Sequence, residues 1–129
     1  AFMDYYTEDL EVTDIGNYTA MGGLWCKWDW SHAQPDLGGF KSPIPTTSVD
    51  MTYAMKRNPS MSVLVQQDYY DLATPHLQTE YYMEHMDTPD ELSENIEIEY
   101  YEAGHMMYIH EPSMVKYKDD LARFVQNGE

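Results

Sequence analysis

The sequence predicts an α/β fold in which parallel strands are joined by crossover helices, with a less regular segment in front. Residues 61–67 and 96–101 have strand character, and amphipathic segments stand before, between and after them. This alternation of helix and strand is typical of a parallel sheet. Hydrophobic residues make up 43% and aromatic residues 14% of the 129 residues, so we expect a packed core.

Residues 1–47 are predicted to be the less regular segment. Apolar side chains at helical spacing predict a helix over residues 2–10. Three glycines within residues 14–23 predict turns or a short strand, and prolines and glycines predict a loop over residues 34–47. Between these lies a cluster of three tryptophans, whose simplest interpretation is packing in a core or beneath a lid: Trp25, Trp28 and Trp30.

Residues 48–129 are predicted to carry the sheet. Ser48 can cap a helix that Pro59 ends, and an apolar strand follows over residues 61–67. Thr74 and Pro75 are typical of a helix cap and first turn.

Further along, Thr88 begins a capping box for a short helix. Residues 96–101 alternate apolar and charged side chains, as a strand does, and Pro112 opens the last helix. Two strands make a poor parallel sheet, because such sheets are covered on both faces and flanked by neighbours. Together with Ala1 standing where an initiator methionine would be, this predicts that part of the fold lies outside the chain.

The charge is strongly acidic, with 23 acids against 7 bases and a formal net charge of −16. Such a field repels phosphate backbones and anionic lipids, so we expect neither nucleic acid nor membrane as a partner. A solvated acidic surface is the simplest explanation. A cation site and an enzyme that works at acid pH are the alternatives.

Two residues are candidates for covalent modification. Cys26 is the single cysteine, so it is either a buried thiol or a bridge to another chain. Asn17 begins an Asn-Tyr-Thr triplet that fits a glycosylation sequon.

Two polar segments mark the candidate site. Asp71 follows the strand at residues 61–67, and His105 follows the strand at 96–101. Active sites of open α/β sheets lie at the carboxyl edge of the strands, so we expect both side chains on one rim, with Gly104 allowing a sharp turn before the histidine. An acid followed by a histidine is the second half of the hydrolase order Ser…Asp…His. A structural aspartate and a surface histidine are the alternative.

A metal site is the other alternative for this region. His105 and His110 lie near several glutamates, but their spacing differs from the His-Glu-x-x-His of zinc peptidases. We therefore expect no metal here.

Two loop motifs resemble those of the serine carboxypeptidase family, in its bacterial branch. Residues 63–75 read VLVQQDYYDLATP and are similar to the family's acid loop, while residues 100–112 read YYEAGHMMYIHEP and are similar to its histidine loop. The resemblance extends upstream through WDWSH at residues 28–32 to the start of the chain, where the family has its lid. Asp68 is a departure, because many members have glycine there.

The resemblance implies the C-terminal part of an α/β-hydrolase sheet preceded by part of a helical lid, divided into residues 1–47 and 48–129. It implies Asp71 as triad acid, His105 as triad base and Met106 as a residue of the leaving-group pocket. The substrate would be the C-terminus of a peptide, cleaved through an acyl-enzyme without an organic cofactor, in a secreted, periplasmic or vacuolar-type compartment.

The nucleophile is missing from this sequence. None of its serines stands in a Gly-x-Ser-x-Gly elbow; they are Ser31, Ser42, Ser48, Ser60, Ser62, Ser93 and Ser113. The resemblance places the serine, the oxyanion hole and the carboxylate-binding residues in an N-terminal chain or segment, without which we expect no activity. A non-catalytic binding or interaction module derived from a hydrolase is the alternative function.

Overall fold

The computed structural model describes residues 2–13, 16, 22–35, 38–43 and 46–128. Contacts between residues divide the chain into two compact units, Ala1–Trp30 and Ser31–Glu129. The predicted division into residues 1–47 and 48–129 followed the resemblance rather than contacts, and it stays a prediction.

Within its described residues, the first unit contains only short helical turns. The helix α1 (Phe2–Asp4) continues into a π-helical turn over Tyr5–Asp9. The helix predicted for residues 2–10 is therefore confirmed, but most of it is π-helical rather than α-helical. A 3₁₀ turn follows at Leu24–Cys26. The turns predicted for residues 14–23 fall mostly outside the described residues.

The tryptophan cluster lies at the surface of the described structure. Trp25 is 70% exposed and Trp28 is 65% exposed, while the indole nitrogen of Trp30 donates to the carbonyl oxygen of Trp25 over 3.1 Å. No core within the described residues covers these rings, so core packing is wrong as their explanation here.

The second unit begins with a small antiparallel pair, β1 (His32–Ala33) and β2 (Lys41–Ser42). The loop predicted for residues 34–47 is therefore wrong at β2. Gly38 has φ 59° and Gly39 has φ 84°, values that favour glycine and suit a hairpin turn.

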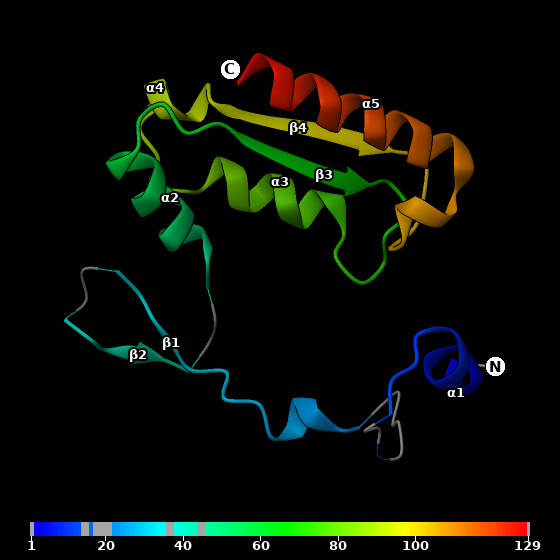
Figure 1. Ribbon diagram of the computed structural model, residues 1–129. Helices are drawn as coiled ribbons and strands as arrows, with labels where there is room; N and C mark the ends of the chain where they lie inside the picture. Colours follow the sequence, from blue (N-terminus) through cyan, green and yellow to red (C-terminus); the bar gives the residue numbers. More distant parts are fainter. Residues whose placement is uncertain (1, 14–15, 17–21, 36–37, 44–45, 129) are drawn as a thin grey trace. The chain divides into compact units, whose positions relative to one another are not determined.

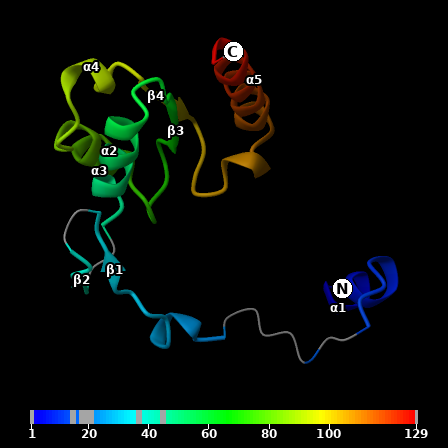
Figure 2. The ribbon, with the colours of Figure 1, turned by 60° about the vertical axis from the view of Figure 1, so that its left-hand side comes forward.

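The main sheet is a parallel pair, β3 (Val63–Asp68) and β4 (Ile96–Tyr101), in register from Val63 opposite Ile96 to Asp68 opposite Tyr101. The predicted parallel pairing is confirmed, and the class is mixed helix and strand. The helices of this unit are α2 (Ser48–Arg57), α3 (His76–Glu84), α4 (Asp90–Ser93) and α5 (Glu111–Asn127). Figures 1 and 2 show α3 and α5 on opposite sides of the two strands.

Alternate side chains of β4 contact the two covering helices. The hydroxyl of Tyr100 donates to Glu80 of α3 over 2.7 Å. On the other face, Glu99 accepts hydrogen bonds from Lys116 at 2.6 Å and Arg123 at 2.9 Å, both on α5. The charged residues of the alternating strand therefore bind a helix rather than face solvent.

The hydrophobic core of the described residues is small. Its buried members are Met55 of α2, Tyr101 of β4 and Ala103. Met114 and Leu121 of α5 are exposed. Apolar surface that a larger fold would bury is thus left open. No described helix has the length and apolar character needed to cross a bilayer.

Candidate active site

Asp71 and His105 contact each other in the loops that follow β3 and β4. A hydrogen bond from the amide of Tyr70 to the carbonyl oxygen of Ala103, 3.0 Å long, continues the strand pairing into these loops. It holds the loops side by side at the carboxyl edge of the sheet. As a result, Nδ1 of His105 lies 2.9 Å from Oδ2 of Asp71.

The Asp71 carboxylate is buried and fully supplied with donors. Its Oδ1 accepts the amides of Ala73 at 2.7 Å and Thr74 at 3.0 Å, and its Oδ2 accepts the Thr74 hydroxyl at 2.6 Å. These bonds from Thr74, first from its hydroxyl and then from its amide, hold the pKa of Asp71 well below its usual value, and His105 adds to the effect. Asp71 is therefore ionised over the ordinary pH range.

The ionised acid fixes the tautomer of His105. Because Asp71 only accepts, Nδ1 of His105 carries the hydrogen and Nε2 keeps its lone pair. The imidazole is 64% exposed, and Nε2 makes no hydrogen bond within the described part of the chain. A basic nitrogen is thus presented to whatever lies against this edge of the sheet, which is the arrangement of a general base awaiting a proton donor.

Gln67 is a supporting residue that the sequence did not single out. It is 7% exposed, and its amide nitrogen donates to the carbonyl oxygen of Thr74 at 2.6 Å while its oxygen accepts from Thr79 at 2.7 Å. These bonds tie the acid loop to β3 and α3. The available signal was a polar side chain inside a strand otherwise read as apolar.

Gly104 does not have the predicted role in turning the chain. A Cβ placed there would meet the carbonyl oxygen of Tyr70 at 3.7 Å, which is an ordinary contact. Its φ is also not in the left-handed region, where strain would favour glycine. The turn before His105 therefore does not require glycine.

Met106 lies beside His105 in an open hollow of about 510 Å³. Its side chain is 48% exposed. The other lining residues are Tyr70, Glu102, Ala103, Gly104, Ile109 and His110. The hollow is mainly apolar and has no lysine or arginine, so it suits an uncharged side chain next to the basic nitrogen.

The other candidate residues from the sequence are Cys26 and Asn17. Cys26 is an exposed free thiol in the first unit, and a bridge to another chain stays a prediction. Asn17 lies outside the described residues. Over the described parts of the chain, no three His, Cys, Asp or Glu side chains gather in a way that could hold a metal ion.

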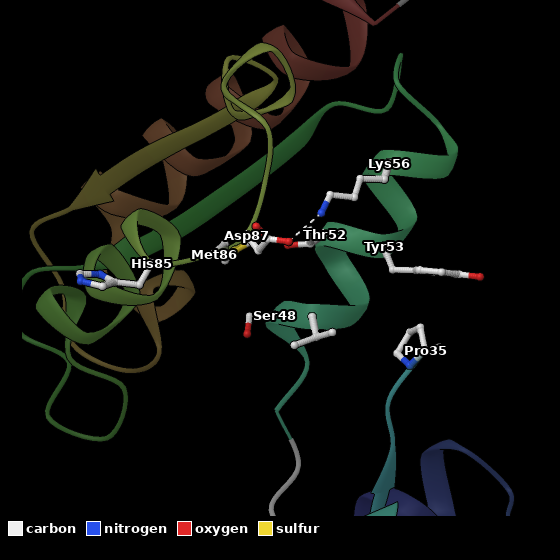
Figure 3. Close-up of a pocket in the computed structure, with 9 residues that line it drawn as sticks. Pro35, Ser48, Thr52, Tyr53, Lys56, His85, Met86 and Asp87 are labelled. Carbon is white, nitrogen blue, oxygen red and sulfur yellow. Dashed lines mark hydrogen bonds and ion pairs between the residues drawn. The ribbon is translucent and has the colours of Figure 1, made fainter. Parts of the chain in front are cut away.

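A second hollow, of about 330 Å³, lies between α2 and the turn after α3 (Figure 3). An ion pair from Lys56 to Asp87, 2.9 Å long, lies in it. Its buried Thr52 hydroxyl is bonded to Thr88. Among the residues that line this hollow, no carboxylate is bonded to a histidine in the way that Asp71 is bonded to His105.

No family model matches this chain, and neither does a curated protein or a solved structure.

Proposed function

We propose that the chain is the C-terminal portion of a serine-type carboxypeptidase with an α/β-hydrolase fold. It supplies the triad acid, Asp71, and the triad base, His105, while an N-terminal chain or segment supplies the serine. The observation that carries the proposal is the 2.9 Å bond between Asp71 and His105, with the other histidine nitrogen open. The two loop motifs that resemble the serine carboxypeptidase family support it independently.

The reaction follows from the protonation state of the pair. Nε2 of His105 takes the serine proton as the serine oxygen attacks the carbonyl carbon of the last peptide bond. Asp71 stabilises the imidazolium that forms. The imidazolium then returns the proton to the leaving amine, which frees the C-terminal amino acid and leaves an acyl-enzyme. Water activated by His105 hydrolyses the ester and restores the serine. Met106 would border the leaving group.

The incomplete sheet supports the need for an N-terminal partner. Within the described residues, β3 and β4 pair only with each other, which leaves both outer edges unpaired. The core is limited to a few side chains, and parallel sheets are stable when both faces are covered. Further strands beside this pair would bury the open surface and bring the serine to the carboxyl edge. Alone, the chain would be inactive.

The setting follows from the same family resemblance. A secreted, periplasmic or vacuolar-type compartment suits the acidic composition and allows a disulfide from the exposed Cys26 to the partner. Neither a metal nor an organic cofactor takes part in this chemistry.

A second candidate function is a non-catalytic interaction module. Its specific support is the exposed tryptophan cluster, because Trp is common at interface hot spots. In that case the hydrogen bonds that Asp71 accepts from the amides of Ala73 and Thr74 would serve only to shape the turn before α3.

The test is a carboxypeptidase assay at acid pH on the chain isolated with its native partner. Replacing His105→Ala should lower kcat by about 10⁴-fold or more, because the base is lost. His85→Ala is the matched control, since His85 is an exposed histidine stacked on Tyr81 outside the site, and it should leave the rate unchanged. Equal activity in both variants would contradict the proposal.

A further inference from the structure

A second buried acid, Asp68, lies at the same strand end as Asp71. It is the last residue of β3 and is only 2% exposed, opposite Tyr101 in the register. Its Oδ1 is buried and has no hydrogen-bond partner among the residues that the structure describes. Buried polar atoms are nearly always bonded, so an unbonded carboxyl oxygen here calls for an explanation.

Four donors near this strand end bond to Asp71 rather than to Asp68. The amides of Ala73 and Thr74, the Thr74 hydroxyl and His105 all bond to Asp71. In the described part of the chain, no lysine or arginine forms an ion pair with Asp68. If Asp68 and Asp71 were both ionised, two negative charges would share one buried site with a single imidazole beside them.

The two acids respond in opposite directions. Burial raises the pKa of Asp68, the charge of Asp71 raises it further, and His105 opposes them by lowering it. Other titratable side chains line the surroundings of this strand end: Tyr69, Tyr70, Tyr101 and Glu102 of the strands and loops, His76 and Glu80 of α3, and Lys116 and Asp120 of α5. Lys116 is paired with Glu99 and Asp120, so it does not neutralise Asp68.

We propose that Asp68 is a positioning residue that carries a proton when the Asp71–His105 pair is in order. Protonated Asp68 leaves Asp71 as the one negative charge that holds His105. Ionised Asp68 adds a second buried charge and loosens the loop that carries Asp71. The ordered arrangement of Asp71 and His105 is therefore more stable at acid pH, where Asp68 carries its proton. The meaning of this for catalysis rests on the proposed function, whereas the protonation of Asp68 does not.

The sign of the pH dependence follows from linkage. Because the pKa of Asp68 is higher in the folded chain than in the unfolded chain, the folded chain binds the proton more tightly. The stability so gained is complete below the ordinary pKa of 3.8 and is lost as the pH rises through the raised pKa. Removing the carboxyl should thus help the fold at neutral pH and make no difference in strong acid.

The test is a carbon-detected NMR titration of the aspartate carboxyls in the full chain, combined with urea unfolding. Asp68 should titrate above 3.8, and its signal should be the one missing in Asp68→Asn. Asp68→Asn should unfold at higher urea than the wild type at pH 7, and the difference should vanish below pH 3.8. Asp119→Asn, at an exposed position of α5, should show no such difference.

An ordinary titration midpoint for Asp68 would overturn the inference, whether or not the chain is otherwise folded. Asp68→Gly, which removes the side chain entirely, guards against a penalty from the asparagine amide. If neither variant is more stable than the wild type at pH 7, the inference is wrong.

The pH profile of the assembled enzyme separates this inference from the proposed function. Asp68→Asn should keep the acid-pH activity and extend it to higher pH, whereas His105→Ala should be inactive throughout. A raised Asp68 midpoint with a fully active His105→Ala variant would sink the enzyme and leave Asp68 as proposed. An ordinary midpoint with an inactive His105→Ala variant would do the reverse.

Discussion

Asp71 serves two structural purposes with one carboxylate. Its Oδ1 shapes the turn into α3 through the amides of Ala73 and Thr74, and its Oδ2 orients His105. A purely structural aspartate would need only the first set of bonds. The second bond is what gives His105 a defined tautomer, and with it a defined direction for proton transfer.

The first residue-scale prediction concerns this tautomer. Asp71→Asn keeps the size of the side chain but removes the charge, so His105 can adopt the wrong tautomer. In the assembled enzyme, kcat should fall by about 10⁴-fold. The control is Asp87→Asn, an exposed acid paired with Lys56, which should keep full activity. A small loss in Asp71→Asn would mean that Asp71 does not set the tautomer of His105 for catalysis.

Thr74→Val is predicted to change the acid limit of stability. The pKa of Asp71 is depressed, so its stabilising contribution is present above the unfolded value of 3.8 and is lost as the pH falls through the lower folded pKa. Removing the hydroxyl removes the largest cause of the depression, so acid unfolding should begin at higher pH. Circular dichroism during acid titration measures this, with Thr13→Val as the control. Identical acid limits would contradict it.

The helix caps predicted from the sequence were wrong. Thr74 and Thr88 were expected to cap helices, but Pro75 and Pro89 occupy those cap positions. Likewise, Thr47 rather than Ser48 precedes α2. The threonine hydroxyls are bonded elsewhere, Thr74 to Asp71 and Thr88 to Thr52. Competition from distant partners is not visible in a local cap pattern.

At the scale of elements, ion pairs hold α5 against β4. Lys116 binds Glu99 at 2.6 Å and Asp120 at 2.7 Å, and its ammonium lies 4.6 Å from the centre of the Tyr101 ring. Arg123 adds bonds to Glu97 and Glu99 on the same strand. The network therefore connects α5 to the charged face of β4, a kind of face that in most strands is exposed to solvent.

Lys116→Met tests this network. The side chain is 47% exposed, so solvent screens the pairs and we expect a loss of about 1 kcal/mol or less in the free energy of unfolding. The loss should shrink in 1 M salt, because the Debye length falls to roughly 3 Å and the ion pairs are screened more strongly. Lys118→Met, an exposed position of the same helix, should have no effect in urea unfolding at either salt concentration. A loss that does not depend on salt would point to packing instead.

The order of elements was predictable where the pattern was long and periodic. The strand at residues 96–101 was predicted with the bounds that β4 has, and the parallel pairing followed from the helix between the strands. The hairpin of β1 and β2 was missed because each strand has only two residues. Such short strands carry no periodicity, although the paired glycines at positions 38 and 39 were a usable turn signal.

For the molecule as a whole, very few apolar side chains are buried among the residues that the structure describes, so each of them should matter to stability. Met55→Ala should lower the free energy of unfolding by about 2–5 kcal/mol, because Met55 is fully buried and its truncation removes apolar contacts and leaves a cavity. Met114→Ala, at a 44% exposed position, is the matched control and should change little in urea unfolding. Equal effects would mean that the core lies elsewhere.

The exposed apolar surface near the candidate site suits a further part of the fold. Leu72 is 93% exposed and Ile109 is 71% exposed, and both lie in the loops around Asp71 and His105. The sequence did not reveal that these two side chains are exposed, because an apolar residue near a strand end is expected to be buried. The proposed N-terminal partner would cover these side chains together with the strand edges.

The most direct test of the central claim is labelling with a serine-directed fluorophosphonate, followed by intact mass analysis before and after reduction. The chain should be isolated under native conditions with whatever partner it retains. We expect a labelled serine on a larger N-terminal chain or segment, with labelling abolished by His105→Ala and retained by His85→Ala. A monodisperse 129-residue species without partner, label or carboxypeptidase activity would contradict it.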